Sequence, residues 1–167
     1  MRDLATDWDT GRIGEHDVFT ALAASTGLAL AVVEAHADAR CASVTFHRAT
    51  WDMVRAHRLP QALVTVNPDL FVRRIVARHA LADAFDAIVV SSVEHTADKT
   101  QLCEIALERL GYDGPRAAAL LVDNRADLCD AWRATGGAAY RYRGDDDFAA
   151  RFEAVLAGET ADQASTR

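Results

Sequence analysis

Polar side chains that could bind a phosphate group and a divalent cation follow three short apolar runs of this sequence. Each run ends in hydroxyl, amide or carboxylate side chains, and the second run leads on to a lysine. Hydroxyl and ammonium groups hold phosphate oxygens, and carboxylate and amide oxygens are suitable ligands for Mg²⁺. The candidate residues are Thr65, Asn67, Ser91, Lys99, Asp123, Asn124 and Asp127.

Lys99 is the only lysine in the chain, because all the others among its 18 basic residues are arginine. A compact ammonium on a flexible stem is not equivalent to the planar fork of arginine, so a single lysine suggests a specific need. The dipole at a helix N-terminus also disfavours a cation, which weakens a purely structural explanation. The structural alternative is a solvated residue at the start of a helix.

The sequence from Leu59 onward predicts alternating strands and helices. Apolar runs predict strands at residues 62–66, 87–92, 118–124 and 138–143, separated by helices at residues 69–81, 98–111 and 125–137. Uniformly apolar strands that alternate with helices indicate a parallel sheet covered on both faces. The carboxyl ends of such strands share one edge of the sheet, so we expect the candidate residues to meet there.

The sequence before Leu59 predicts helices only, at residues 15–27, 28–39 and 50–58. We therefore expect a helical segment at residues 1–58, a doubly wound α/β core at residues 59–157 and a flexible tail at residues 158–167.

The composition argues against several classes of function. A net charge of -7 and a pI near 5.3 disfavour binding to nucleic acid or to an anionic membrane, since both need basic patches. No apolar run approaches the roughly 18 residues that a membrane span requires. The three cysteines have no CxxC spacing, which favours a reduced cytoplasmic protein.

Three segments, in this order, resemble motifs two, three and four of the haloacid dehalogenase-like (HAD) hydrolase superfamily: ALVTVNPD, VVSSVEHTADKTQLCEIALERLG and AALLVDNRADLCDAWRATGG. Residues 11–57 are similar to the small helical cap of that family, and the resemblance covers about residues 10–145. It implies a Rossmann-like core in which an aspartate nucleophile attacks a phosphate ester or, less often, a carbon–halogen bond. The acidic fourth motif favours a Mg²⁺-dependent phosphatase that acts on a small phosphorylated metabolite.

The resemblance also implies a role for each candidate residue. Thr65 would hydrogen-bond the transferred phosphoryl group, and Lys99 would neutralise the nucleophile and the phosphate. Asn67 and Ser91 would contact the substrate. The Mg²⁺ ligands would be Asp123, Asn124 and Asp127. Structural alternatives exist, because threonine is common in strands and an aspartate after a strand often caps a helix.

Motif one of the family, an apolar strand that ends in an Asp-x-Asp pair, is missing from this chain. DWDTG at residues 7–11 has the spacing, but MRDLAT ahead of it is not an apolar strand, so we interpret it as a solvated helix start. Asn124 stands where the fourth motif often has a second acid, which predicts weaker metal binding. Thr100 follows Lys99 where close relatives usually have proline.

Three interpretations follow from these motifs. In the first, the chain is a HAD-like hydrolase that lacks its N-terminus, with a nucleophile encoded upstream. In the second, it is a nucleophile-less HAD-like module that binds a phosphorylated ligand or a protein partner without hydrolysis. The third is an unrelated flavodoxin-like or receiver-like domain, and it is the weakest because a receiver also needs acids near its first strand.

The missing strand has a consequence for the sheet. In the family, the strand that carries the nucleophile lies between the strand that ends at Thr65 and the strand that ends at Asp123. We therefore expect these two strands to pair directly, or the chain to depend on an upstream strand, a partner strand or a homo-oligomer, since unpaired buried backbone groups are costly.

Overall fold

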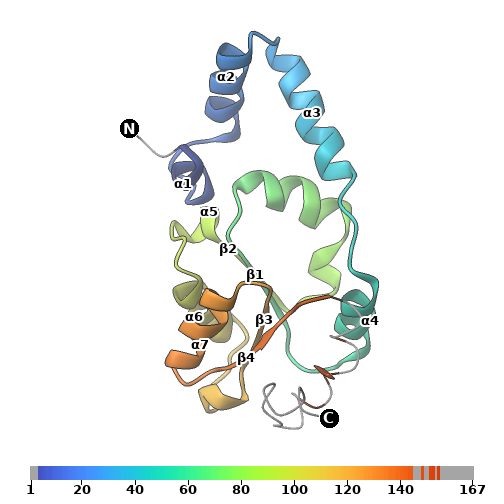
Figure 1. Ribbon diagram of the computed structural model, residues 1–167, viewed down its shortest axis with the longest axis vertical. Coiled ribbons are helices and arrows are strands. Elements are labelled where there is room, and N and C mark those ends of the chain that lie inside the picture. The colour runs from blue at the N-terminus through green and yellow to red at the C-terminus, as the bar shows by residue number, and fades with distance from the viewer. Residues whose placement is uncertain (1–3, 145–147, 149–150, 153, 155–167) are drawn as a thin grey trace. The chain divides into compact units, whose positions relative to one another are not determined.

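Helices alternate with short parallel strands in the computed structural model of the chain, which describes residues 4–144, 148, 151–152 and 154 (Figure 1). The α/β class expected from the sequence is confirmed. The predicted tail at residues 158–167 lies outside the described residues.

The chain divides into two compact units, each built from two separate stretches of the sequence. Unit 1 joins Met1–Thr45 to Leu59–Tyr112, and unit 2 joins Phe46–Arg58 to Asp113–Arg167. The first two predicted helices therefore belong with the first two strands, whereas the third belongs with the last two.

Unit 1 begins with three helices, α1 (Leu4–Asp9), α2 (Glu15–Thr26) and α3 (Leu30–Ala42). The backbone N–H of Gly14 donates to Asp17 Oδ2 at 3.2 Å, which fastens the first turn of α2. Gly27 ends α2 in the left-handed conformation that glycine adopts without strain, with φ of 72°. Among the described residues no single helix is long and apolar enough to cross a membrane, and α2 and α3 qualify only as a pair that bends by 116°.

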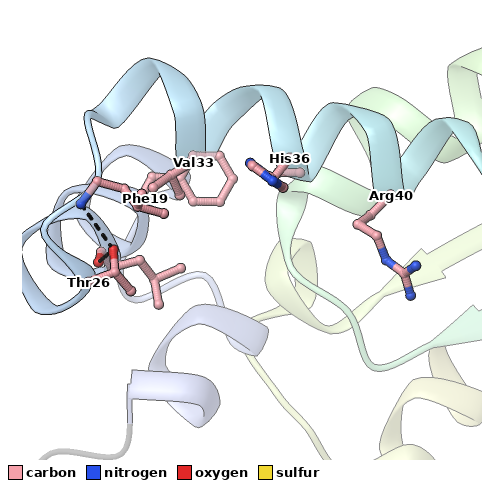
Figure 2. Close-up of a pocket in the computed structure, with 8 residues that line it drawn as sticks. Phe19, Thr26, Val33, His36 and Arg40 are labelled. Atoms are coloured by element: carbon pink, nitrogen blue, oxygen red, sulfur yellow. Dashed lines mark hydrogen bonds between the residues drawn. The ribbon is translucent and has the colours of Figure 1, made fainter.

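An apolar groove of about 330 Å³ lies between α2 and α3 (Figure 2). Phe19 of α2 lies beside Val33 of α3, and His36 and Arg40 follow along the same helix. The full lining is Phe19, Leu22, Thr26, Leu28, Val33, His36, Ala37 and Arg40. Because most of these side chains are apolar, the groove is suited to apolar contacts rather than to a phosphate group.

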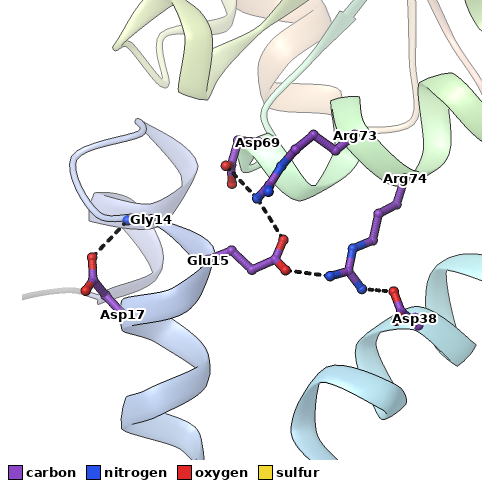
Figure 3. A network of polar contacts seen from close by, with 7 residues as sticks. All are labelled: Gly14, Glu15, Asp17, Asp38, Asp69, Arg73 and Arg74. Atoms are coloured by element: carbon purple, nitrogen blue, oxygen red, sulfur yellow. Dashed lines mark hydrogen bonds and ion pairs between the residues drawn. The ribbon is translucent and has the colours of Figure 1, made fainter. Parts of the chain in front are cut away.

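An ion-pair network fastens this helical hairpin to the helix that follows β1 (Figure 3). The Glu15 carboxylate accepts hydrogen bonds from Arg73 Nη2 at 2.9 Å and from Arg74 Nη2 at 2.5 Å. Arg73 also pairs with Asp69 at 2.8 Å, and Arg74 also pairs with Asp38 of α3. The Glu15 and Arg74 side chains are 13% and 22% exposed, so their ion pair is screened less by solvent than the pair of Glu15 with Arg73, which is 56% exposed.

The remainder of unit 1 is built on two parallel strands, β1 (Ala62–Thr65) and β2 (Ala87–Val90), in register from Ala62 opposite Ala87 to Thr65 opposite Val90. Between them lie the π-helix η1 (Phe71–Val76) and the 3₁₀-helix η2 (Leu81–Asp83). The helices α5 (Ser91–Glu94) and α6 (Lys99–Arg109) follow β2.

The core of unit 1 lies where α6 packs on both strands. It is formed by Val89, Leu102 and Ala106, with Ala62, Val64, Val66 and Ile105 packed around them. The Asp98 carboxylate caps α6 by accepting from the backbone N–H of Thr100 and Gln101. The cap and the packed apolar face of α6 together hold the backbone of Lys99, the first residue of this helix, in place.

Unit 2 contains α4 (Arg48–Ala56), the 3₁₀-helix η3 (Arg116–Ala118), β3 (Leu120–Asp123), α7 (Ala126–Ala134) and β4 (Ala138–Arg141). The strands β3 and β4 are parallel, with Asp123 opposite Arg141. Trp132 of α7 is 2% exposed and its Nε1 donates to Ala119 O at 3.2 Å. Trp132, Cys129 and Tyr140 form the buried centre of this unit.

In the described residues the strands form two separate two-stranded sheets, β1–β2 and β3–β4. The strand that ends at Thr65 lies in unit 1 and the strand that ends at Asp123 lies in unit 2, so the expectation that they pair directly or need an additional strand stays a prediction. All four residues of β1 and of β3 are half-exposed, whereas three of the four residues of β2 are buried.

Candidate functional site

Four of the predicted site residues meet at the carboxyl ends of β1 and β2. Thr65 is the last residue of β1, Asn67 follows two positions later, Ser91 begins α5, and Lys99 begins α6. Lys99 is half-buried, and its Nζ donates to Val64 O at 2.6 Å. The ammonium thus points back at the end of β1, one residue from Thr65, and not into bulk solvent.

Hydrogen bonds link the other three residues in a chain. Asn67 Nδ2 donates to Thr65 Oγ1 at 2.5 Å, and the backbone N–H of Asn67 donates to Ser91 Oγ at 2.9 Å. Because the Thr65 oxygen accepts from Asn67, the Thr65 hydroxyl proton remains available to a ligand. Ser91 is fully buried, and its hydroxyl contacts the backbone of Asn67 and of Asp9. The predicted contact of Ser91 with a substrate stays a prediction.

The turn after α1 is a further part of this edge that the sequence did not reveal. The carbonyl oxygen of Asp9 accepts from Ser91 Oγ at 2.5 Å, and the carbonyl oxygen of Thr10 lies 3.1 Å from His95 Nδ1. Thr10 is 3% exposed and Asp7 is 6% exposed, so the expectation that DWDTG is a solvated helix start is wrong for these residues. The one local signal is the glycine that follows the helix, which is typical of a helix end.

The three predicted metal ligands belong to unit 2. Asp123 Oδ1 accepts the backbone N–H of Arg125 at 2.9 Å, and Asn124 is exposed. Asp127 accepts from Arg125 Nε at 3.1 Å and also from Arg125 Nη2. These hydrogen bonds from Arg125 hold the pKa of Asp127 below its usual value, and the same pair raises the pKa of Arg125.

Two contacts bear on whether a divalent cation binds here. One Asp123 oxygen accepts a backbone N–H, and the Asp127 carboxylate pairs with the Arg125 guanidinium, with both of these side chains more than 60% exposed. Among the described residues no group of three or more His, Cys, Asp or Glu side chains is placed to hold a metal ion. A cation at this position would have to compete with Arg125 for Asp127.

The two sets of residues lie in different units, with Thr65, Asn67, Ser91 and Lys99 in unit 1 and the predicted metal ligands in unit 2. The structure brings the first set together. Convergence of both sets on one pocket stays a prediction.

No protein-family model matches the chain, and no curated protein matches it either.

Proposed function

We propose that the chain is a HAD-like hydrolase module of Rossmann-like type, whose β1–β2 edge binds the phosphoryl group of a small phosphorylated metabolite. The observation that carries the proposal is the position of Lys99. The only lysine of the chain is half-buried at the start of α6, with its ammonium 2.6 Å from the carbonyl oxygen of Val64. A side chain in this position would bring a positive charge to the end of β1.

Thr65 and Lys99 would make different contacts with the phosphoryl group. The Lys99 ammonium would offset the charge of the phosphoryl oxygens, and the Thr65 hydroxyl would donate a hydrogen bond to one of them. Asn67 would hold the Thr65 oxygen through its own side-chain N–H. Hydrolysis also requires a positioned nucleophile, and the sequence offers none with the required strand in front of it.

The second candidate function is binding of a phosphorylated ligand or a protein partner without hydrolysis. The contacts of DWDTG favour it, because Asp9 meets the edge through its backbone carbonyl oxygen at Ser91. We therefore expect the chain to hydrolyse a generic phosphate ester no faster than background in the presence of Mg²⁺.

The test is a titration of the ¹⁵N-labelled chain with orthophosphate, with and without Mg²⁺. We expect saturable amide shifts at Thr65, Asn67 and Lys99. Saturation that leaves these amides unchanged would refute the proposed site. Hydrolysis of p-nitrophenyl phosphate is measured in parallel, and turnover that Asp7→Ala or Asp9→Ala abolishes would show that DWDTG supplies the nucleophile.

Magnesium is tested separately on unit 2. Mg²⁺ is the cofactor implied by the family resemblance, and it would help to neutralise the phosphoryl oxygens when bound. We expect Arg125→Ala to strengthen Mg²⁺-induced shifts at Asp123 and Asp127, because the substitution removes the guanidinium that competes for Asp127. Equal shifts in both proteins would show that Arg125 does not limit access of the metal.

A further inference from the structure

Two adjacent serines after β2 differ in what their hydroxyl groups do. Ser91 is 0% exposed and Ser92 is 6% exposed. Ser91 Oγ accepts the backbone N–H of Asn67 at 2.9 Å, and it lies 2.5 Å from Asp9 O and 3.1 Å from Asn67 O. Ser92 Oγ has no hydrogen-bond partner among the described residues.

The Ser91 hydroxyl has one proton to donate and two lone pairs with which to accept. The shorter contact makes Asp9 O the better acceptor of its proton, and the N–H of Asn67 occupies a lone pair. One buried hydroxyl therefore joins the loop after β1, the start of α5 and the turn after α1, which are far apart in the sequence.

We propose that Ser91 is a positioning residue that orients Asn67 and, through Asn67, the hydroxyl of Thr65. The bonds run from Ser91 Oγ to the backbone N–H of Asn67, and from Asn67 Nδ2 to Thr65 Oγ1. The same hydroxyl ties this orientation to the turn at residues 9–11. The consequence for a ligand rests on the proposed phosphate-binding function, whereas the coupling itself does not.

The turn is held close to this point by Gly11. Its φ is 67°, and a Cβ atom built on it would lie 2.2 Å from the carbonyl oxygen of Ser92. An alanine at this position must therefore move the turn away from α5. Such a movement would pull the Asp9 carbonyl from Ser91 and release the Ser91 hydroxyl.

The first experiment compares Ser91→Ala with Ser92→Ala, which is a matched control of the same chemistry one residue away. Without any ligand, we expect the Asn67 amide to exchange with solvent about tenfold faster in Ser91→Ala, because its acceptor is gone. In Ser92→Ala the rate should stay within about twofold, since removal of a hydroxyl that makes no hydrogen bond breaks none. An unchanged Asn67 amide in Ser91→Ala would overturn the proposal.

Gly11→Ala provides a second perturbation that leaves the serine in place, and it covers the case in which Ser91→Ala fails to fold. The exchange rate of the Asn67 amide should rise, as in Ser91→Ala. The double variant Gly11→Ala/Ser91→Ala should exchange little faster at Asn67 than Ser91→Ala alone, because both substitutions act through one hydroxyl. Fully additive effects of the two substitutions on the exchange rate of the Asn67 amide would show that the turn and Asn67 are not coupled through Ser91.

Orthophosphate titration separates this inference from the proposed function. If phosphate binds, we expect its Kd to rise at least about threefold in Ser91→Ala and to stay unchanged in Ser92→Ala. A hydrogen bond from Thr65 to phosphate is worth about five- to tenfold in affinity, and Ser91→Ala misplaces this bond without removing it. Equal Kd values in the wild type and Ser91→Ala would refute positioning while leaving the binding site intact. A chain that does not bind phosphate, yet shows the Asn67 response, would refute the function and retain the coupling.

Discussion

Replacing Lys99 with methionine should weaken phosphate binding much more than it weakens the fold. The structure supplies a matched control on the same helix, because Arg109 near the other end of α6 also donates to a strand carbonyl. Lys99 Nζ lies 2.6 Å from Val64 O of β1, and Arg109 Nη1 lies 3.0 Å from Ile88 O of β2. Both variants, Lys99→Met and Arg109→Met, keep a long unbranched side chain and lose the charged donor to a strand carbonyl. Arg109→Met also loses the ion pair of Arg109 Nη2 with Glu94 Oε1 at 2.8 Å.

The expected loss of stability is at least as large for Arg109→Met as for Lys99→Met, because Arg109 also pairs with Glu94. A hydrogen bond from a charged group contributes about 1.5–3 kcal/mol net in a protein. Lys99 is half-buried and the Arg109 side chain is 41% exposed, so water replaces part of each bond. We therefore expect the free energy of unfolding, measured by urea denaturation, to fall by about 1 kcal/mol in Lys99→Met and by about 1–2 kcal/mol in Arg109→Met.

The effect on phosphate affinity should differ between them. Loss of a charged donor to the ligand should raise the Kd for orthophosphate by about 10- to 100-fold in Lys99→Met. Arg109→Met should leave this Kd unchanged. Lys99→Arg keeps the charge but replaces a compact ammonium with a planar fork, and we expect it to recover only part of the affinity. Equal loss in Lys99→Met and Arg109→Met would refute the functional reading of the single lysine.

Three further predictions follow from packing. A Cβ atom on Gly137 would lie 2.1 Å from Trp132 Nε1, so Gly137→Ala should lower the free energy of unfolding by about 1–3 kcal/mol. Gly136 has open space around it, so Gly136→Ala should show only the penalty of a positive φ. Burial raises the pKa of the fully buried Cys129 thiol, so it should react with a thiol reagent only on unfolding, and its contribution to stability should fall as the pH rises above the usual thiol pKa. In hydrogen exchange the amides of β2 should be better protected than those of β1 and β3, and equal protection would show that another segment covers the half-exposed strands.

The elements of the fold could be predicted from the sequence because they depend on local patterns. Apolar runs located all four strands, and the structure begins and ends them within a few residues of the predicted positions. Thr65, Asn67, Ser91 and Lys99 could also be proposed, since polar residues after parallel strands share an edge. The sequence predicts one helix at residues 69–81, whereas the structure has the π-helix η1 at Phe71–Val76 and the 3₁₀-helix η2 at Leu81–Asp83.

The support of the site could not be predicted, because it depends on side-chain to backbone bonds between distant segments. Ser91 and Asp9 are 82 positions apart, and no periodicity or motif relates them. The burial of DWDTG could not be predicted either, because its contact with Ser91 is not visible in the sequence and no apolar strand precedes it. The division into units is equally non-local, because residues 46–58 associate with residues that follow 112.

The burial of the strands explains how one edge can be both rigid and accessible. β2 is mostly buried and carries the start of α5, where Ser91 is enclosed, whereas β1 is half-exposed along its whole length. Thr65 pairs with Val90 in the ladder, so its backbone is held by the buried strand while its hydroxyl stays within reach of a ligand. A fully buried β1 would hide Thr65, and without Ser91 the loop that carries Asn67 would lose its anchor to β2. A buried strand beside a half-exposed strand is thus consistent with the phosphate-binding edge that we propose.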